Sequence, residues 1–146
     1  MLSPSLEDYL EEIYRLSTLK DNIRVRDIAD QLSVSSPSVV KALKKLNGEN
    51  YINYERYSEI SLTPKGKKLG NLLVKRNAVL QEFLTVIHSY CDKGKEAEAM
   101  EHYLSSPTIS AIENLIAFMH QDQVKKMFDE FNNSIIDQHW SEYIQK

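Results

Sequence analysis

The chain has 146 residues, of which 42% are hydrophobic and 27% charged, as is typical of a globular protein with one or two small domains. No apolar run approaches the roughly 20 residues that a membrane-spanning helix needs, and the first residues lack a secretory leader, so we expect no membrane partner. The single cysteine, Cys91, excludes an internal disulfide and favours a cytoplasmic location.

The net charge of −3 argues at first against a nucleic-acid partner, but the charge is unevenly distributed. Residues 19–70 carry ten Lys/Arg against six Asp/Glu, a net of +4, whereas residues 71–146 carry seven against eleven, a net of −4. This asymmetry is typical of a basic DNA-binding head attached to an acidic body.

The first half of the chain predicts the connectivity of a winged helix-turn-helix. Apolar residues at helical spacing after Ser3-Pro4 predict a first helix, and a short second helix is expected over residues 25–32. After a tight turn at residues 33–35, Ser35 or Ser36 caps a third helix that continues to about residue 46. Residues 51–54 and 60–62 are rich in β-favouring side chains and predict two short strands.

The second half is expected to be all helical. Thr63 and Pro64 open a long helix that reaches about residue 88, and residues 92–94 interrupt the pattern. Further helices are expected around residues 96–104, from Ser106-Pro107 onward and from about residue 121. We therefore predict a mainly α fold, with a winged helix-turn-helix of three helices and a β-hairpin wing at residues 1–70 and an all-helical domain at residues 71–146, the linking helix starting near residue 64.

The third helix has the pattern of a recognition helix. One face carries its buried stripe, at Val39, Ala42, Leu43 and Leu46, and the opposite face carries the candidate DNA contacts Ser36, Pro37, Val40, Lys41 and Lys44. Small or polar groups near the helix N-terminus can approach base edges, lysines can reach phosphates, and a valine can contact a thymine methyl group. The alternative is an ordinary surface helix.

Two further groups extend this candidate DNA surface. Arg56 and Tyr57 lie at the expected tip of the hairpin, where a wing would contact the minor groove or the backbone. Lys65, Lys67 and Lys68 fall in the first turns of the next helix, where cations oppose the helix dipole, so phosphate contacts explain them better than helix stability does. A solvated surface remains the alternative for both groups.

Two acidic clusters far apart in sequence predict a metal site. Each has the spacing that places its members on one helical face: Asp8-x-x-Glu11, and Glu98-x-x-Glu101-His102. The first has a simple alternative, because acids near a helix N-terminus are stabilising and Glu11 can pair with Arg15. In the second, two carboxylates and an imidazole share one edge, and they suit a hard or borderline ion such as Mn²⁺ or Fe²⁺.

Asn77 is the third element of this candidate site. It falls on the buried stripe of the long helix, and a buried amide must find partners. Its oxygen could ligate a metal weakly, bind a ligating carboxylate or form an ordinary internal hydrogen bond.

These segments together resemble the diphtheria-toxin-repressor family of metal-dependent repressors, in particular its short manganese-type members. The likeness runs almost the full length and is strongest at Pro4-Ser5-Leu6-Glu7-Asp8-Tyr9-Leu10-Glu11, at residues 27–29 and 34–46, at Leu62-Thr63-Pro64-Lys65-Gly66-Lys67-Lys68, and at residues 98–105. The resemblance implies a homodimer that binds double-stranded operator DNA and represses metal-uptake genes when manganese is abundant. It makes the helical domain the site of dimerisation and metal binding.

The resemblance also implies a ligand set. It assigns metal binding to Asp8, Glu11, Glu98, Glu101 and His102, with Mn²⁺ as the ion and Fe²⁺, Co²⁺ or Zn²⁺ as substitutes in vitro. One departure matters, because the family has a histidine ligand on the long helix where this chain has Asn77. An amide oxygen is a poorer donor, so we expect a lower affinity or a shift towards oxygen-preferring ions.

The sequence therefore predicts a manganese-responsive transcriptional repressor. One alternative is a winged-helix regulator whose metal site is impaired or altered at Asn77, so that it responds weakly or to another ion such as iron. Another is a hydrolase that uses the carboxylates around a catalytic metal. The sequence shows no evident nucleophile and no phosphate-binding loop, so we expect neither enzyme activity nor a small organic substrate.

Overall fold

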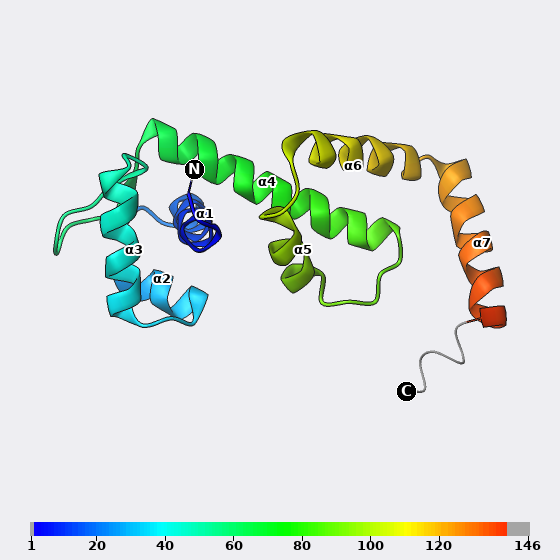
Figure 1. The fold of residues 1–146 in the computed structure, drawn as a ribbon, viewed down its shortest axis with the longest axis horizontal. Helices are drawn as coiled ribbons and strands as arrows, with labels where there is room; N and C mark the ends of the chain where they lie inside the picture. Colours follow the sequence, from blue (N-terminus) through cyan, green and yellow to red (C-terminus); the bar gives the residue numbers. More distant parts are fainter. Residues whose placement is uncertain (1, 140–146) are drawn as a thin grey trace. The chain divides into compact units, whose positions relative to one another are not determined.

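The protein is described here by a computed structural model, which places residues 2–139 and their side chains as far as residue 135. Its elements, in chain order, are α1 (Pro4–Leu19), α2 (Val25–Leu32), α3 (Ser36–Gly48), β1 (Ile52–Asn53), β2 (Ser61–Leu62), α4 (Pro64–Val86), α5 (Lys93–Glu101), α6 (Ser106–Met119) and α7 (Asp122–His139) (Figure 1). The predicted mainly α fold is confirmed. Among the described residues, no helix combines the length and apolarity needed to cross a membrane.

The chain forms two compact units, which divide within α4 between Ala78 and Val79. We call them the first and the second unit. The domain division expected at residue 70 stays a prediction.

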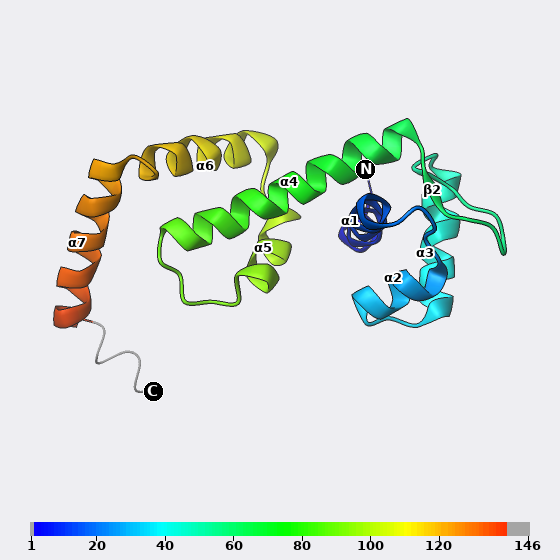
Figure 2. The same cartoon turned by 180° about the vertical axis from the view of Figure 1, so that it is seen from behind.

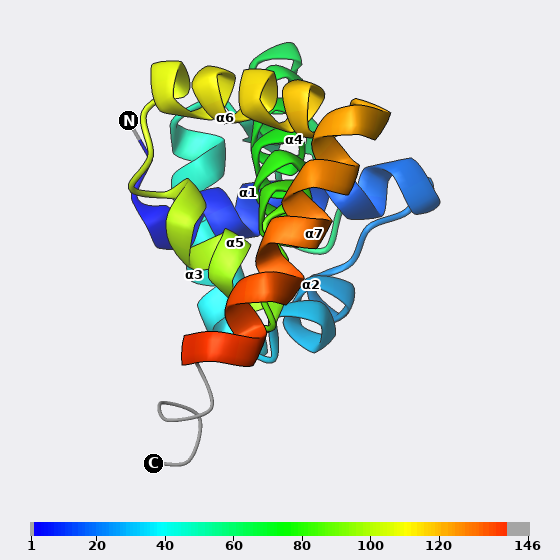
Figure 3. The same ribbon diagram turned by 90° about the vertical axis from the view of Figure 1, so that its right-hand side faces the viewer.

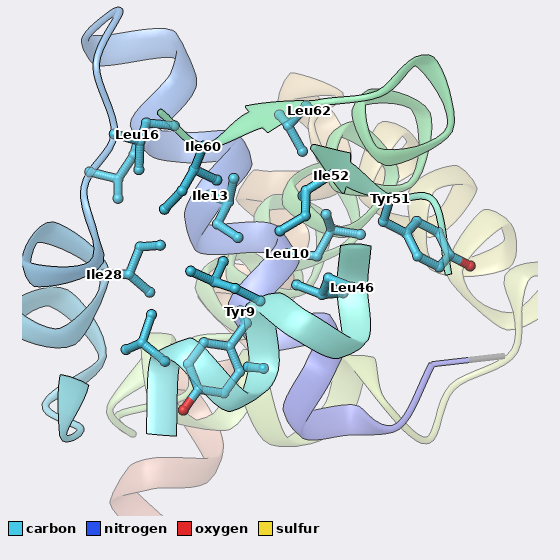
Figure 4. Close-up of a cluster of buried hydrophobic side chains, with 14 of the residues drawn as sticks. Tyr9, Leu10, Ile13, Leu16, Ile28, Leu46, Tyr51, Ile52, Ile60 and Leu62 are labelled. Carbon is cyan, nitrogen blue, oxygen red and sulfur yellow. The ribbon is translucent and has the colours of Figure 1, made fainter. Parts of the chain in front are cut away.

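The core of the first unit is built by the apolar stripes of its three short helices. Leu10 and Ile13 of α1, Ile28 of α2 and Leu43 of α3 are all fully buried. Figure 4 shows several of these side chains converging with residues of the hairpin. Burying each such side chain contributes roughly 1.5–3 kcal/mol, so this cluster fixes the helices against one another.

A tight turn joins α2 to α3. Ser33 adopts the left-handed conformation (φ 53°), and the backbone N–H of Val34 donates to the carbonyl of Ala29, which ends α2. Ser35 then caps α3, its Oγ accepting from the backbone N–H of Ser38 at 3.4 Å. The buried stripe predicted for α3 is confirmed, because all four of its members are buried: Val39, Ala42, Leu43 and Leu46.

The wing is a short antiparallel hairpin, in which Ile52 pairs with Leu62 and Asn53 with Ser61. Its strands are shorter than predicted, because the N–H of Tyr54 donates to the side-chain oxygen of Asn47 (3.0 Å) and thus leaves the ladder. Beyond the strands, the connecting loop projects past α3 (Figure 2).

The first turn of α4 lies directly against the hairpin. Thr63 caps the helix by accepting from the N–H of Gly66 (3.0 Å) and donates to the carbonyl of Asn50 (2.7 Å). A Cβ on Gly66 would lie 1.8 Å from the carbonyl oxygen of Tyr51, so no other residue fits at this approach. The helix ends at Val86, two residues earlier than predicted, because His88 takes the left-handed conformation (φ 57°).

The second unit packs α5, α6 and the end of α4 around a small apolar core that includes Leu80, Leu84, Ala97 and Ile109. Its helix α5 begins and ends three residues earlier than predicted. Asp92 caps its start by accepting from the N–H of Lys95, and after Glu101 the N–H of Tyr103 donates to the carbonyl of Met100 (3.1 Å), a three-residue spacing that departs from the α-helical pattern.

In the second unit α6 leads directly into α7 (Figure 3). Two histidine–carboxylate pairs join these helices to the end of α4. His88 Nε2 lies 2.8 Å from Asp129 Oδ1 and its ring stacks on Phe128, while His120 Nε2 lies 2.9 Å from Glu82 Oε1. These polar contacts link the helices of the second unit to one another in addition to its small apolar core.

Candidate metal and DNA-binding sites

The outward face of α3 is accessible along its length. Four of the predicted contacts are exposed and Val40 is half-buried, as listed here in chain order: Ser36, Pro37, Val40, Lys41 and Lys44. The capped N-terminus of α3 also carries the positive end of the helix dipole, which favours a nearby phosphate. This arrangement has the features of a recognition helix, although base contact by these residues stays a prediction.

A groove of about 870 Å³ lies between this helix and the wing. Val40 and Lys44 line it from α3, and Arg56 and Tyr57 line it from the wing loop. The structure thus brings two of the predicted DNA-binding groups to one concave surface.

The tip of the wing is a tight turn with an unusual residue in it. Ser58 N–H donates to the carbonyl of Glu55 (3.0 Å), and Tyr57 occupies the left-handed position (φ 68°) that normally favours glycine. Arg56 stacks its guanidinium 5.1 Å from the Tyr57 ring, and that ring is 92% exposed. A strained, fully exposed aromatic residue is more typical of a contact surface than of a folding element.

The three lysines of α4 have different surroundings. Lys65 donates from Nζ to the carbonyl of Glu49 (2.8 Å) and lies 3.9 Å from the centre of the Tyr51 ring. Lys65 therefore links the start of α4 to the residue that follows α3, a stabilising contact that was not predicted from the sequence. Lys67 and Lys68 are exposed and available to a phosphate.

In the first unit, the candidate metal ligands Asp8 and Glu11 lie one turn apart on α1. Asp8 is half-buried and Glu11 is buried. Glu11 Oε1 accepts from Nε of Arg15 at 3.1 Å, which confirms the ion pair considered as an alternative for Glu11. The Arg15 guanidinium therefore already contacts one oxygen of this candidate metal ligand.

In the second unit, the candidate ligands lie at the end of α5. Glu101 is its last residue and only 1% exposed, and the adjacent His102 places Nε2 at 3.9 Å from Glu101 Oε1. A carboxylate buried so deeply must have its charge compensated, and a carboxylate beside an imidazole is a donor set suited to Mn²⁺ or Fe²⁺. Glu98 lies one turn earlier and is exposed, so the structure brings Glu101 and His102 together but leaves Glu98 at the surface.

Asn77 is 7% exposed on α4, which confirms the burial expected from its position on the apolar stripe. The role of its amide in metal binding stays a prediction, as does the assignment of the other metal and DNA contacts to individual residues.

Two further residues that line the groove were not predicted from the sequence. Asn22 and Arg24, in the segment before α2, also line it. Periodicity could not identify them, because they lie outside any helix and reach the groove only through pairing of Ile23 with Ile60 of the wing.

Two sequence profiles of a single family cover most of the chain. "Iron dependent repressor, N-terminal DNA binding domain" matches residues 1–60, and "Iron dependent repressor, metal binding and dimerisation domain" matches residues 63–127. The chain belongs to the iron dependent repressor family. The DNA-binding profile lies within the first unit, whereas the metal-binding and dimerisation profile begins at residue 63, within the first unit, and continues through most of the second. The family is one of transcriptional repressors and not of enzymes.

Similar proteins include manganese regulators. The HTH-type transcriptional regulator MntR of Listeria welshimeri is 41% identical over 134 residues, covering 87% of this chain and 92% of its own. MntR of Bacillus subtilis is 41% identical over 127 residues, covering 86% and 89%. Among solved structures, the manganese regulator SloR (30% identity) and the metal-dependent regulator MtsR (27%) each match with a TM-score of 0.71 over 80% of this chain, which spans about half (55%) of their length.

Proposed function

We propose that this protein is a homodimeric, manganese-responsive repressor that binds the operators of metal-uptake genes in the cytoplasm. The observation that carries the proposal is the buried Glu101–His102 pair in a chain whose other unit presents an exposed recognition helix. Membership of the repressor family and 41% identity to two MntR proteins support the same function.

The metal would be bound by oxygen-rich donors. The proposed ligand set consists of Asp8 and Glu11 from α1, Glu98, Glu101 and His102 from the end of α5, and Asn77 as a weak ligand or as a partner of a ligand. Carboxylates with one imidazole fit Mn²⁺ and Fe²⁺, whereas the intrinsic order of affinities favours Zn²⁺, so selectivity must come from geometry and cellular supply. When bound, the ion supplies positive charge that neutralises several carboxylates at once.

The proposed control of DNA binding is thermodynamic linkage. Because the ligands belong to both units, an ion that binds one arrangement of the dimer more tightly than others shifts the population towards it. If that arrangement spaces the two recognition helices correctly for one operator, manganese raises operator affinity, and operator DNA raises manganese affinity by the same factor.

Glu98 allows a direct test, because it is exposed and its loss leaves the core of the second unit intact. An operator selected by the wild-type protein from random duplexes in the presence of Mn²⁺ is titrated with protein by fluorescence anisotropy, at fixed salt, with Mn²⁺ or with chelator. The wild type should gain about 5–150-fold in operator affinity with Mn²⁺, the range of ordinary allosteric coupling. Glu98→Ala should lose most of that gain with little change in thermal stability.

Glu96→Ala is the matched control, since Glu96 is an exposed acid on the same helix, two residues away. It should keep the manganese response of the wild type. Equal operator affinity of the wild type with Mn²⁺ and with chelator would refute the manganese-responsive repressor. Repeating the titration with Fe²⁺, Co²⁺ and Zn²⁺ ranks the ions.

A further inference from the structure

The groove between α3 and the wing is lined on its third side by Arg24, a residue of the segment between α1 and α2. Ile23 pairs with Ile60 of the wing, which fixes this segment beside the base of the hairpin. Ile23 is 2% exposed and turned to the core, and Arg24 has an extended backbone (φ −116°, ψ 156°). Since side chains alternate along extended backbone, Arg24 points away from the core and into the groove.

The charges of the groove favour a polyanion. Three cations from three different elements line it, Arg24 before α2, Lys44 on α3 and Arg56 on the wing, and Glu59 is the one acid among the lining residues. Cations placed on separate walls of an open groove match a chain of phosphates better than a single compact anion.

Arg24 is also available for such a contact. The nearby carboxylate of Asp27 pairs with Nζ of Lys20 and accepts the backbone N–H of Arg24, and the Arg24 guanidinium acts on this carboxylate only through its charge, without an ion-pair contact. Within the described part of the chain the Arg24 side chain forms no ion pair, whereas Arg26, two residues later, pairs with Asp30.

We propose that this groove holds one sugar-phosphate strand of the DNA duplex and that Arg24 is a phosphate contact. The inference rests on the proposed function, since it needs a protein that binds duplex DNA. In this arrangement α3 and the wing contact the duplex on either side of the strand, and Arg24 sets its position without reading the base sequence.

The test is the salt dependence of DNA binding by the full-length dimer. Arg24→Gln keeps the backbone N–H that donates to the Asp27 carboxylate at the start of α2. Arg26→Gln is the matched control, because it removes an equal charge from the same region but outside the groove. In the presence of Mn²⁺, each protein is titrated into the selected operator and into an unrelated duplex of about 30 base pairs. The titrations are repeated at salt concentrations between about 50 and 200 mM.

Each neutralised phosphate contributes about 0.9 to the slope of log affinity against log salt, so Arg24→Gln should lower the slope by about 1.8 per dimer on both duplexes. Arg26→Gln should leave the slope close to that of the wild type. Circular dichroism melting confirms that both variants are folded.

An unchanged slope for Arg24→Gln would overturn the inference, and so would an equal loss in Arg26→Gln, which would reflect general charge. A loss confined to the operator would also overturn it, because Arg24 would then be reading a base. If the wild type binds neither duplex, the proposed function itself fails, which is a distinct outcome.

Discussion

At the scale of single residues, Asn77 is the position at which this chain departs from its family pattern. It is buried on α4, where the resemblance leads us to expect a histidine. An imidazole is a stronger neutral donor than an amide oxygen for Mn²⁺, Co²⁺ and Zn²⁺ alike. The identity of this one side chain should therefore set both the affinity and the selectivity of the metal site.

Asn77→His tests that role. The variant should bind Mn²⁺ more tightly by about tenfold or more, the scale on which residues around a metal centre act, with a larger gain for Zn²⁺. Isothermal titration calorimetry of each ion into wild type and variant measures the change. Asn71→His, on the same helix, is the control and should not alter affinity. If Asn77→His bound both ions as the wild type does, Asn77 would lie outside the metal site.

At the scale of elements, the start of α2 depends on one carboxylate. Asp27 accepts hydrogen bonds from the backbone N–H of Arg24 (2.7 Å) and from the ammonium of Lys20 (2.5 Å). Both lower the pKa of Asp27 below its usual value of 3.8, the Lys20 hydrogen bond more than the Arg24 N–H. A lowered pKa in the folded state means that the ionised carboxylate stabilises the fold above the unfolded pKa, and that this stabilisation is lost as the pH falls.

Asp27→Asn should therefore lower the free energy of unfolding at neutral pH by about 0.3–1 kcal/mol, the range for an acid at a helix N-terminus. The difference from wild type should persist down to about pH 5 and close as the pH falls below 3.8, the usual value for this carboxyl. Urea denaturation across this pH range measures it. Asp30→Asn is the control, because Asp30 pairs with Arg26 at 3.6 Å at an exposed site. A difference that stays constant with pH would contradict this account.

The elements of the fold were largely predictable, and their arrangement into sites was not. The bounds of α2 follow from its apolar spacing, and the starts of α3 and α6 at a serine–proline pair follow from local chemistry, although the cap of α6, Ser105, was not predicted. The early end of the hairpin ladder depends on the side chain of Asn47, seven residues before Tyr54, and no local pattern contains that contact. For the same reason the place of Arg24 in the groove was not predicted. Lys65 was recognised as a cation near the DNA surface, but its hydrogen bond to the carbonyl of Glu49, just after α3, was not predicted.

At the scale of the whole molecule, the dimer requires a surface on the second unit. Four large apolar side chains there are exposed at helical spacing: Leu115 (43%) and Phe118 (53%) on α6, and Met127 (69%) and Phe131 (61%) on α7. A monomer gains nothing from exposing them, whereas fully burying each contributes roughly 1.5–3 kcal/mol. The family profile over residues 63–127 is a metal-binding and dimerisation domain and covers three of these residues, so we expect them and the neighbouring Phe131 to contact a second copy of the chain.

Phe131→Asp should break the dimer, because it would place an unpaired carboxylate in an apolar interface and weaken association by about two orders of magnitude or more. Sedimentation equilibrium measures the change, and Leu19→Asp, at an 80% exposed leucine of the first unit, is the control that should remain dimeric.

Loss of the dimer should also weaken operator binding, because the dimer joins two DNA-binding domains. A monomer engages one half of an operator at a time and loses the effective concentration that a tethered second head provides. Phe131→Asp should therefore bind operator far more weakly than the wild type even at saturating Mn²⁺, whereas a fully dimeric, fully active Phe131→Asp would move the interface to another face.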